Sequence, residues 1–269
     1  MRAASPPDGI LVAVAHGSAD PRAAATIADL MAVVAERATR RGLTVPNLHA
    51  AYLGHAAPSV PEVLRGIGAG PVTVLPLLLT AAHHSEADIP RTLARVGGRF
   101  PRLQISYGAP LGPHPLLLDA LGRRLAQADP TGVRDQTGVV LAAAGSSDPD
   151  ANATIARLAA RWQARAGWLT VRAAYASVAS PDPAAAVTGL LRDGVRRVVV
   201  ATYLLAPGYF ADRIRDSSLA AGAVAVSPAL GASAEVADVL LDRWSRRAGR
   251  HIELPARPRL RRGVAQQAT

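Results

Sequence analysis

An internal repeat constrains this chain more than any other feature of its sequence. The segment 15–21 (AHGSADP) returns at 143–149 as AAGSSDP, 128 residues later. Further along, the apolar run Val72–Leu79 corresponds to Val198–Leu205, and the residues that follow each run also correspond. Matches in the same order indicate a duplicated unit of about 120 residues, and hence one supersecondary pattern used twice.

The composition between the two copies marks their joint. Pro, Gly, Asp and Thr cluster at 129–138, as expected of a connecting loop. We therefore expect a first lobe over 1–132 that carries the functional site and a degenerate second lobe over 133–249. The remaining residues, 250–269, are basic and lack periodicity, so we expect a disordered tail.

Short apolar runs alternate with helical stretches within each unit. In the first unit, Asp20–Pro21 and the capping pattern Ser59–Glu62 are typical of helix starts. Apolar strands separated by helices indicate a parallel sheet covered on both faces. The expected fold is therefore α/β, with two tandem repeats, each a four-stranded parallel sheet with helices on both faces. The expected strands of the first unit lie at 10–15, 44–53, 71–79 and 102–108, and its expected helices at 22–41, 60–68, 86–98 and 115–127.

The composition excludes several classes of chemistry. Because the chain has no cysteine, it has no disulfide, thiolate nucleophile or iron–sulfur cluster, and any metal must be held by nitrogen and oxygen. The glycine patterns of dinucleotide and phosphate loops are missing, and Ser18 lacks the context of a serine nucleophile. No apolar run approaches the roughly 20 residues of a spanning helix, and the N-terminus does not resemble a secretory leader. We expect a cytoplasmic protein with no membrane partner.

The charge balance favours an acidic small molecule over nucleic acid as a partner. Arginine supplies all 30 basic residues against 20 acidic ones, a formal charge of +10. Such an excess attracts anions in general, but an aromatic content of 4% leaves few platforms on which bases could stack. We expect no nucleic-acid partner. A coding bias towards arginine, with most guanidinium groups on solvated helix faces, stays open as an alternative.

The histidines are distributed unevenly between the two units. Six of the seven lie in the first unit, and the second unit has none. His16 directly follows the first expected strand, and His83 and His84 follow the third. Because ligands bind outside the carboxyl ends of parallel strands, these imidazoles are expected at one edge of the sheet. Their counterparts in the second unit include Ala144 and Phe210, so we expect one functional unit and one scaffold unit.

Four motifs follow one another along the first unit. They are Val14–Ser18 with Asp20–Pro21, Ala51–Leu53 with Ala57–Ser59, Pro76–Leu79 with His84 and Asp88–Pro90, and Leu111–Pro113. In this order they resemble the sirohydrochlorin chelatase and cobaltochelatase family, class II chelatases related to ferrochelatase, in its long form with two repeats. The resemblance covers all but the two ends of the chain. It implies a chelatase-like fold and the insertion of a divalent metal into a tetrapyrrole without a nucleotide or organic cofactor.

The resemblance also assigns the metal-binding residues. His16 and His84 match the two metal-binding histidines of the family, and we expect them to be both the metal ligands and the catalytic residues. Two imidazoles leave coordination positions open, as a catalytic metal site requires, and neutral imidazole accepts protons near neutral pH. The family often places a carboxylate after the second strand, where this chain has Gly54 followed by His55. Whether His55 or Glu86 supplies a third ligand stays open. The competing interpretations are that His55 is an exposed loop histidine and that Glu86 is a first-turn residue favoured by the helix dipole.

The implied substrate, sirohydrochlorin, carries eight carboxylates. Guanidinium groups pair with carboxylates in a bidentate manner, so arginines near the cleft between the lobes are candidates to bind it. For each arginine, a solvated helix face is the competing interpretation. The expected substrate-binding residues are Ser18, His83, Arg22, Arg91, Tyr209 and Arg213.

We expect insertion of Fe²⁺ towards sirohaem as the preferred reaction of this chain. Cobalt insertion for corrinoid biosynthesis is the near alternative, and Ni²⁺ is a further candidate, because relative affinities do not determine which metal a site receives in the cell. A non-catalytic metal or tetrapyrrole carrier also stays open because the carboxylate ligand is missing. We expect a monomer.

Overall fold

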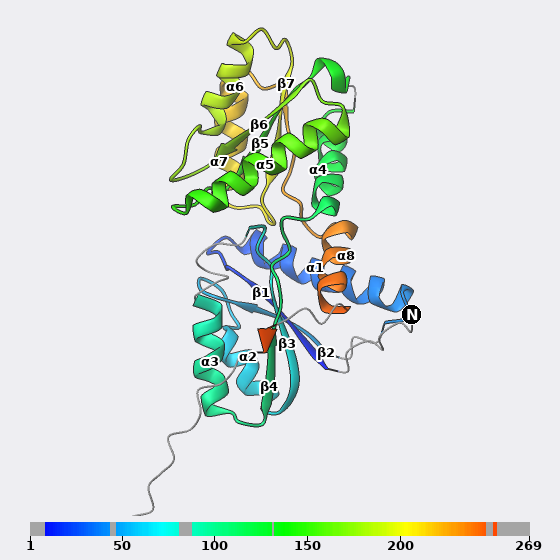
Figure 1. Cartoon of the computed structure of the whole chain (residues 1–269), viewed down its shortest axis with the longest axis vertical. Coiled ribbons are helices and arrows are strands. Elements are labelled where there is room, and N and C mark those ends of the chain that lie inside the picture. Colours follow the sequence, from blue (N-terminus) through cyan, green and yellow to red (C-terminus); the bar gives the residue numbers. More distant parts are fainter. Residues whose placement is uncertain (1–8, 44–46, 81–87, 131, 246–249, 252–269) are drawn as a thin grey trace, which may run out of the picture.

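The computed structural model describes residues 9–43, 47–80, 88–130, 132–245 and 250–251, which form two parallel sheets with the same strand order (Figure 1). The first sheet has the order β2-β1-β3-β4, with the short β9 (Arg250–His251) added antiparallel beside β4, and the second has the order β6-β5-β7-β8. The duplicated sequence is therefore a duplicated fold, and the expected α/β architecture of two repeated sheets is confirmed. The strands are β1 (Ile10–Ala15), β2 (Asn47–Tyr52), β3 (Gly70–Pro76), β4 (Leu103–Tyr107), β5 (Gly138–Ala143), β6 (Thr170–Tyr175), β7 (Val198–Tyr203) and β8 (Ala225–Val226).

Helices cover both faces of each sheet. Polar side chains fix several of their starts: Asp20 caps α1 and Asp148 caps the equivalent α5. At the start of α2, Ser59 and Glu62 form the reciprocal capping box that the sequence predicts. The helices are α1 (Pro21–Arg40), α2 (Val60–Ile67), α3 (Ile89–Arg99), α4 (Pro115–Ala128), α5 (Pro149–Ala166), α6 (Pro183–Arg192), α7 (Tyr209–Ala220) and α8 (Ala234–Ser245), with a 3-10 turn at Arg134–Gln136.

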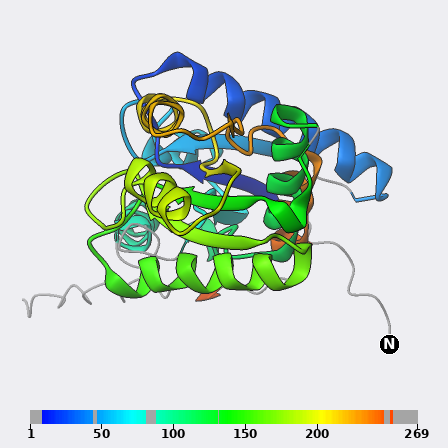
Figure 2. The same cartoon turned by 90° about the horizontal axis from the view of Figure 1, so that it is seen from above.

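The two repeats exchange their last helices. Helix α4, from the first repeat, packs against β7 and β8 of the second sheet, whereas α8, from the second repeat, packs against α1 and β3 of the first (Figure 1). Seen from above, α4 and α8 lie at the same side of the molecule, where they contact each other (Figure 2). The expected boundary between residues 132 and 133 thus separates the two sequence repeats but not the two packed lobes. The chain enters the second lobe at α4, before this boundary, and returns to the first lobe at α8, after it.

The exchange gives the lobes a common core. In β1, Leu11, Ala13 and Ala15 face a buried cluster that also contains Leu141 of β5 and residues of α1, α4, α5 and α8. The alternate residues, including Val12, face a separate cluster under α2 and α3, and the second sheet has a matching cluster under α6 and α7. Because successive side chains of a strand point to opposite faces, one face of each sheet packs in a core of its own lobe and the other face packs in the core that both lobes share.

Several boundaries differ from those the sequence predicts. The strand expected to end at residue 79 ends at Pro76, and the helix expected from residue 86 is described from Ile89, since 81–87 lie outside the described residues. Arg250–His251, expected in the disordered tail, form a two-residue strand β9 antiparallel to the end of β4. Residues 252–269 lie outside the described part. No described helix is long and apolar enough to span a membrane.

Candidate active site

His16 lies where the sequence predicts, directly after β1 at the carboxyl edge of the first sheet. Strand β1 is hydrogen-bonded to both β2 and β3, so the segments that follow these three strands leave the sheet at one edge. The carbonyl oxygen of His16 accepts a hydrogen bond of 3.1 Å from the backbone N–H of Gly54, which ties the segment after β2 to the one after β1. The His16 side chain is exposed at this edge.

Glycine at position 17 is required for this arrangement. Gly17 has a φ of +90°, and a Cβ atom there would lie 1.7 Å from the carbonyl oxygen of Gly54. The second lobe repeats the contact, because a Cβ at Gly145 would lie 2.1 Å from the carbonyl oxygen of Ser177. The glycine in the repeated motif therefore serves a close backbone approach, which explains why it survives in the lobe that has lost its histidines.

The backbone orients the His16 imidazole. Its Nδ1 lies 3.2 Å from the carbonyl oxygen of Gly17. A carbonyl can only accept, so a hydrogen bond there requires the proton on Nδ1 and leaves the lone pair on Nε2. Metal-ligating histidines commonly hold their second ring nitrogen in this way, which fixes the tautomer that can bind a cation.

The remaining predicted metal ligands are not brought together among the described residues. His84 and Glu86 lie outside them, as does His83, which is predicted to contact substrate, so the pairing of His16 with His84 stays a prediction. His55 is described: it is exposed and has a φ of +58°. Within the described ranges, no three His, Asp or Glu side chains are grouped closely enough to hold a metal ion.

The position of the missing carboxylate has room for a side chain. A Cβ atom built on Gly54 would have no heavy atom within 4 Å, and its φ is not in the left-handed region. Because the backbone N–H of Gly54 is bonded to the His16 carbonyl, a longer side chain there would start beside the candidate ligand. The backbone at Gly54 therefore accepts a longer side chain.

The second lobe contributes the loop after β7 to the same site. A Cβ at Gly208 would lie 3.8 Å from the Cβ of Asp20 and 3.9 Å from the Oγ of Ser18. The Oγ of Ser18 accepts a hydrogen bond from the Asp20 backbone N–H, which shapes the turn into α1. Ser18, predicted to contact substrate, thus lies at the contact between the two lobes, two residues from His16.

An ion-pair cluster closes this contact. The Nη2 of Arg22 lies 2.6 Å from an oxygen of Asp20 in the first lobe and 2.6 Å from an oxygen of Asp212 in the second. Hydrogen bonds from Arg22 lower the pKa of both carboxyl groups below their usual range, so both stay ionised at neutral pH. Arg22, predicted to bind a substrate carboxylate, is therefore already bonded to two protein carboxylates.

The other predicted substrate-binding residues are dispersed around the site. Tyr209 and Phe210 begin α7 and are 70% and 39% exposed, with their rings in an edge-to-face contact at 5.6 Å. Arg213 is exposed on the next turn, and the structure gives it no ion pair with any described residue. Arg91 is exposed on α3 and pairs with Asp88 of the same helix end at 3.5 Å.

Sequence analysis missed Asp212, although the repeat contains a signal for it. The spacing that aligns Phe210 with His84 also aligns Asp212 with Glu86, so both units carry a carboxylate two residues after the aligned pair. The sequence gives no sign that Asp212 contacts Arg22, since the two residues are 190 positions apart.

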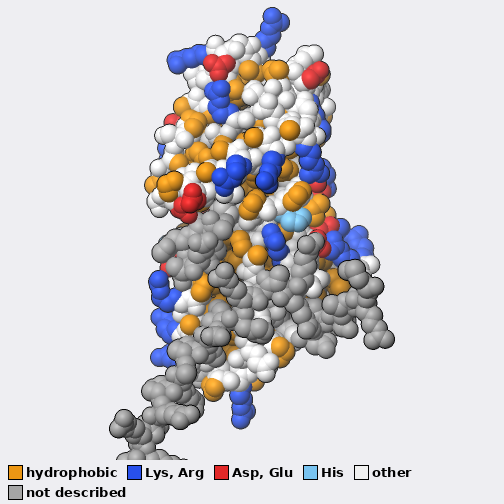
Figure 3. Space-filling model, viewed as in Figure 1, with side chains coloured by type: hydrophobic (Ala, Val, Ile, Leu, Met, Phe, Trp, Pro, Cys, Tyr) orange, Lys and Arg blue, Asp and Glu red, His pale blue; other side chains and the backbone are white. Residues whose placement is uncertain are grey.

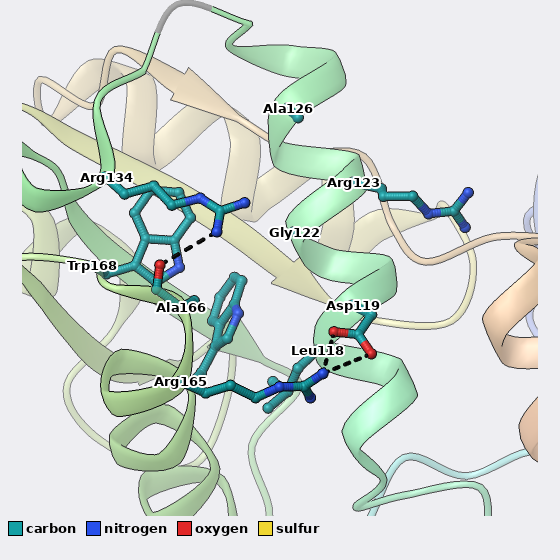
Figure 4. A pocket seen from close by; sticks show the side chains of 10 residues that line it. Leu118, Asp119, Gly122, Arg123, Ala126, Arg134, Arg165, Ala166 and Trp168 are labelled. Atoms are coloured by element: carbon teal, nitrogen blue, oxygen red, sulfur yellow. Dashed lines mark hydrogen bonds and ion pairs between the residues drawn. The ribbon is translucent and has the colours of Figure 1, made fainter.

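A cavity lies elsewhere, between α4 and α5 of the second lobe (Figure 4). It has a volume of about 400 Å³ and is lined by Trp162, Trp168 and three arginines. Arg165 is paired with Asp119, and Arg134 lies over the Trp168 ring while donating to the Ala166 carbonyl. The third, Arg123, pairs with Glu235. The cavity contains no histidine and its guanidinium groups are engaged, so it lacks the features of a metal-insertion site.

Arginines are also spread over the face shown in Figure 3. On the described part of the face shown in Figure 3, basic side chains stand among uncharged and apolar ones and do not form one continuous stripe. This distribution does not resemble the basic stripe that is typical of a nucleic-acid-binding face.

Comparison with known proteins covers both repeats. A family model described as CbiX matches residues 10–128 and 138–247. A sirohydrochlorin ferrochelatase of Priestia megaterium is 28% identical over 180 residues, which are 66% of this chain and 67% of that protein. A sirohydrochlorin cobaltochelatase of the same organism is 28% identical over 58% of this chain and 54% of that protein. The solved structure of SirB from Bacillus subtilis with Fe³⁺ has a TM-score of 0.73 and 26% identity, covering 89% of this chain and 95% of that one.

Proposed function

This chain belongs to the CbiX family, and on that premise we propose that it inserts a divalent metal ion into sirohydrochlorin, with Fe²⁺ preferred and sirohaem as the end of the pathway. The metal is a substrate, and no nucleotide or organic cofactor takes part. The observation that carries the proposal is the position of His16: it is exposed at the carboxyl edge of the sheet, and its Nδ1 lies 3.2 Å from the Gly17 carbonyl oxygen.

The chemistry needs a ligand that both holds and releases the ion. Insertion forms bonds from the metal to the pyrrole nitrogens and releases two protons from pyrrole N–H groups. We propose that His16 and His84 hold the ion with open coordination positions, which a transferable metal requires. As the metal leaves Nε2 of His16, that nitrogen becomes a proton acceptor beside the macrocycle. One side chain thus serves as ligand and then as base.

The surroundings of His16 suit a planar polycarboxylate. The exposed rings of Tyr209 and Phe210 offer apolar area to the macrocycle, and Arg22, Arg91 and Arg213 offer guanidinium groups to its carboxylates. Ser18 and His83 complete the proposed substrate contacts.

An anaerobic absorbance assay tests the proposal. Purified protein is mixed with excess sirohydrochlorin and Fe²⁺, Co²⁺ or Ni²⁺ in turn. We expect conversion of many equivalents of substrate, fastest with Fe²⁺. Rates no higher than those without protein, for all three metals, would refute the proposal. A faster rate with Co²⁺ would keep the chelatase and change its metal.

A carrier is the second candidate function because Gly54 removes a donor that chelatases of this family often have. A carrier would bind one equivalent of metal or tetrapyrrole and convert no excess substrate. Turnover in the same assay separates the two candidates. We also propose that the protein is a monomer, which gel filtration tests by elution at the mass of one chain.

A further inference from the structure

We propose that Asp212 is an internal competitor for a carboxylate of the substrate. In the unliganded protein it occupies the outer edge of the Arg22 guanidinium, and a carboxylate of the tetrapyrrole replaces it there on binding. This inference rests on the proposed function, and it assigns to the second lobe a residue that weakens substrate binding and speeds release.

The two carboxylates use different edges of Arg22. Asp20 accepts from Nε at 3.0 Å and from Nη2 at 2.6 Å, whereas Asp212 accepts from Nη2 at 2.6 Å and from Nη1 at 3.4 Å. The Nη1–Nη2 edge is therefore the one that faces the second lobe. A carboxylate of the substrate would form the same fork-to-fork contact at this edge.

Asp20 also caps a helix, whereas the side-chain contacts of Asp212 with the described residues are with guanidinium groups. Asp20 caps α1 by accepting from the Arg22 backbone N–H at 2.9 Å, and its own N–H donates to Ser18. Among the described helices, none is capped by the Asp212 carboxylate. A second cation is within reach, because the Nη1 of Arg215 lies 3.4 Å from Asp212 while its Nε bonds Asp216. When a substrate carboxylate takes Arg22, Asp212 keeps a cationic partner on its own helix.

The Arg22–Asp212 pair lies where replacement of Asp212 by a substrate carboxylate would affect substrate binding. It joins the start of α1 to the start of α7, beside the exposed Tyr209 and Phe210 rings and six residues after His16. The side chains are accessible, at 50% for Arg22 and 33% for Asp212. Exposed ion pairs contribute little net stability, so replacing one carboxylate by another on the same guanidinium costs little.

Competition by Asp212 and a purely structural role for the Arg22–Asp212 pair predict opposite effects of Asp212→Asn on substrate binding. If the Arg22–Asp212 pair only held the lobes in their binding geometry, Asp212→Asn would weaken substrate binding. If Asp212 competes, Asp212→Asn leaves the outer edge of Arg22 vacant and strengthens binding. The measured dissociation constant, Kd, therefore decides between the two by its direction.

The experiment measures the Kd of metal-free sirohydrochlorin by its fluorescence, using the full chain. We expect Asp212→Asn to lower Kd by about threefold to fivefold at low salt, in line with the size of an exposed ion pair. Arg22→Gln should raise Kd, and Asp212→Asn should then have no further effect in the Arg22→Gln protein. The matched control is Asp193→Asn, which removes a carboxylate from the exposed Arg172 ion pair of the same lobe and should leave Kd unchanged.

The outcomes separate this inference from the proposed function. An unchanged or higher Kd in a folded Asp212→Asn protein would overturn the competition, while metal insertion by the wild type would still support the chelatase. Conversely, tight binding of sirohydrochlorin without turnover would reject the chelatase. The direction in which Asp212→Asn changes Kd would then still decide whether Asp212 competes. Failure of the wild type to bind sirohydrochlorin would overturn both.

Discussion

The phenol of Tyr203, at the end of β7, donates a hydrogen bond of 3.1 Å to the carbonyl of Leu79 in the first lobe. Tyr203 is 2% exposed. Gly112 passes so close that a Cβ there would lie 2.0 Å from the Leu79 oxygen and 2.7 Å from the Tyr203 oxygen. A side chain of the second lobe thereby fixes the backbone that leads from β3 towards the segment containing His83 and His84.

Tyr203→Phe should lower the free energy of unfolding by about 1 kcal/mol or more, because the Leu79 carbonyl loses a buried donor. The loss should depend on pH. Burial raises the pKa of Tyr203 above its ordinary value of 10.0, so its contribution is complete below about pH 10 and is lost as the pH rises through the folded-state value. Denaturant unfolding between pH 8 and 11 should show a steeper alkaline loss in the wild type than in Tyr203→Phe.

Tyr52→Phe is the control for that series, since Tyr52 is a buried phenol within the first lobe and its pKa is also raised by burial. Equal stability of wild type and Tyr203→Phe at pH 8 would show that the contact between Tyr203 and Leu79 contributes nothing.

His16→Ala and His84→Ala should each abolish metal insertion without a large change in thermal stability, because His16 is exposed and its proposed role is at the ion. His114→Ala provides the contrast. The Nδ1 of His114 accepts from the Leu116 N–H and caps α4, so its removal should cost about 1 kcal/mol while insertion continues. Rates and melting temperatures of the three variants test the assignment, which full activity in both His16→Ala and His84→Ala would reject.

Gly54→Glu should add a donor beside His16 and tighten Co²⁺ binding by about tenfold, since a further charged oxygen ligand strengthens a site built on imidazoles. The open space at this position predicts that the fold tolerates the side chain. Calorimetric titration with Co²⁺ measures the effect. Gly54→Ala is the matched control, because it adds the Cβ without the carboxylate, and equal Co²⁺ affinity of the two variants would argue against a third ligand at this position.

Asp238→Asn should loosen the exchanged helix α8. Asp238 is 13% exposed and binds both Arg37 of α1 and Arg41, the residue that follows the helix, and its hydrogen bond raises the pKa of Arg37. We expect the free energy of unfolding to fall by about 1–3 kcal/mol, because two guanidinium groups lose a partly buried partner. Asp242→Asn, which removes a carboxylate 36% exposed from Arg41 alone, should cost less in the same urea titration. The reverse order would contradict the proposed role of Asp238.

The repeat and the strand periodicity predict the architecture well because they depend on local pattern. The same pattern does not predict the helix exchange. Leu117 and Leu121 of α4 and Val236 and Leu240 of α8 present similar apolar faces, so either helix could cover either sheet. Periodicity determines which residues are buried. The connections on either side of the joint determine which sheet each helix packs against.

The site was predictable to a similar degree. Position after a strand placed His16 correctly, since the edge of a parallel sheet follows from strand order. Asp212, which pairs with Arg22, and Leu79, which accepts from Tyr203, each come from the other lobe, and a single sequence carries no signal for such pairings.

The exchange of α4 and α8 between the lobes has a consequence for cutting this chain into two fragments. A polypeptide severed at residue 132 would yield two pieces, each holding the helix that its neighbour needs and each leaving one sheet face bare. Neither piece is a self-sufficient unit, and they would regain a closed core only by assembling together. Fusion of the two copies in one chain therefore makes intramolecular what separate subunits would have to achieve by meeting in solution.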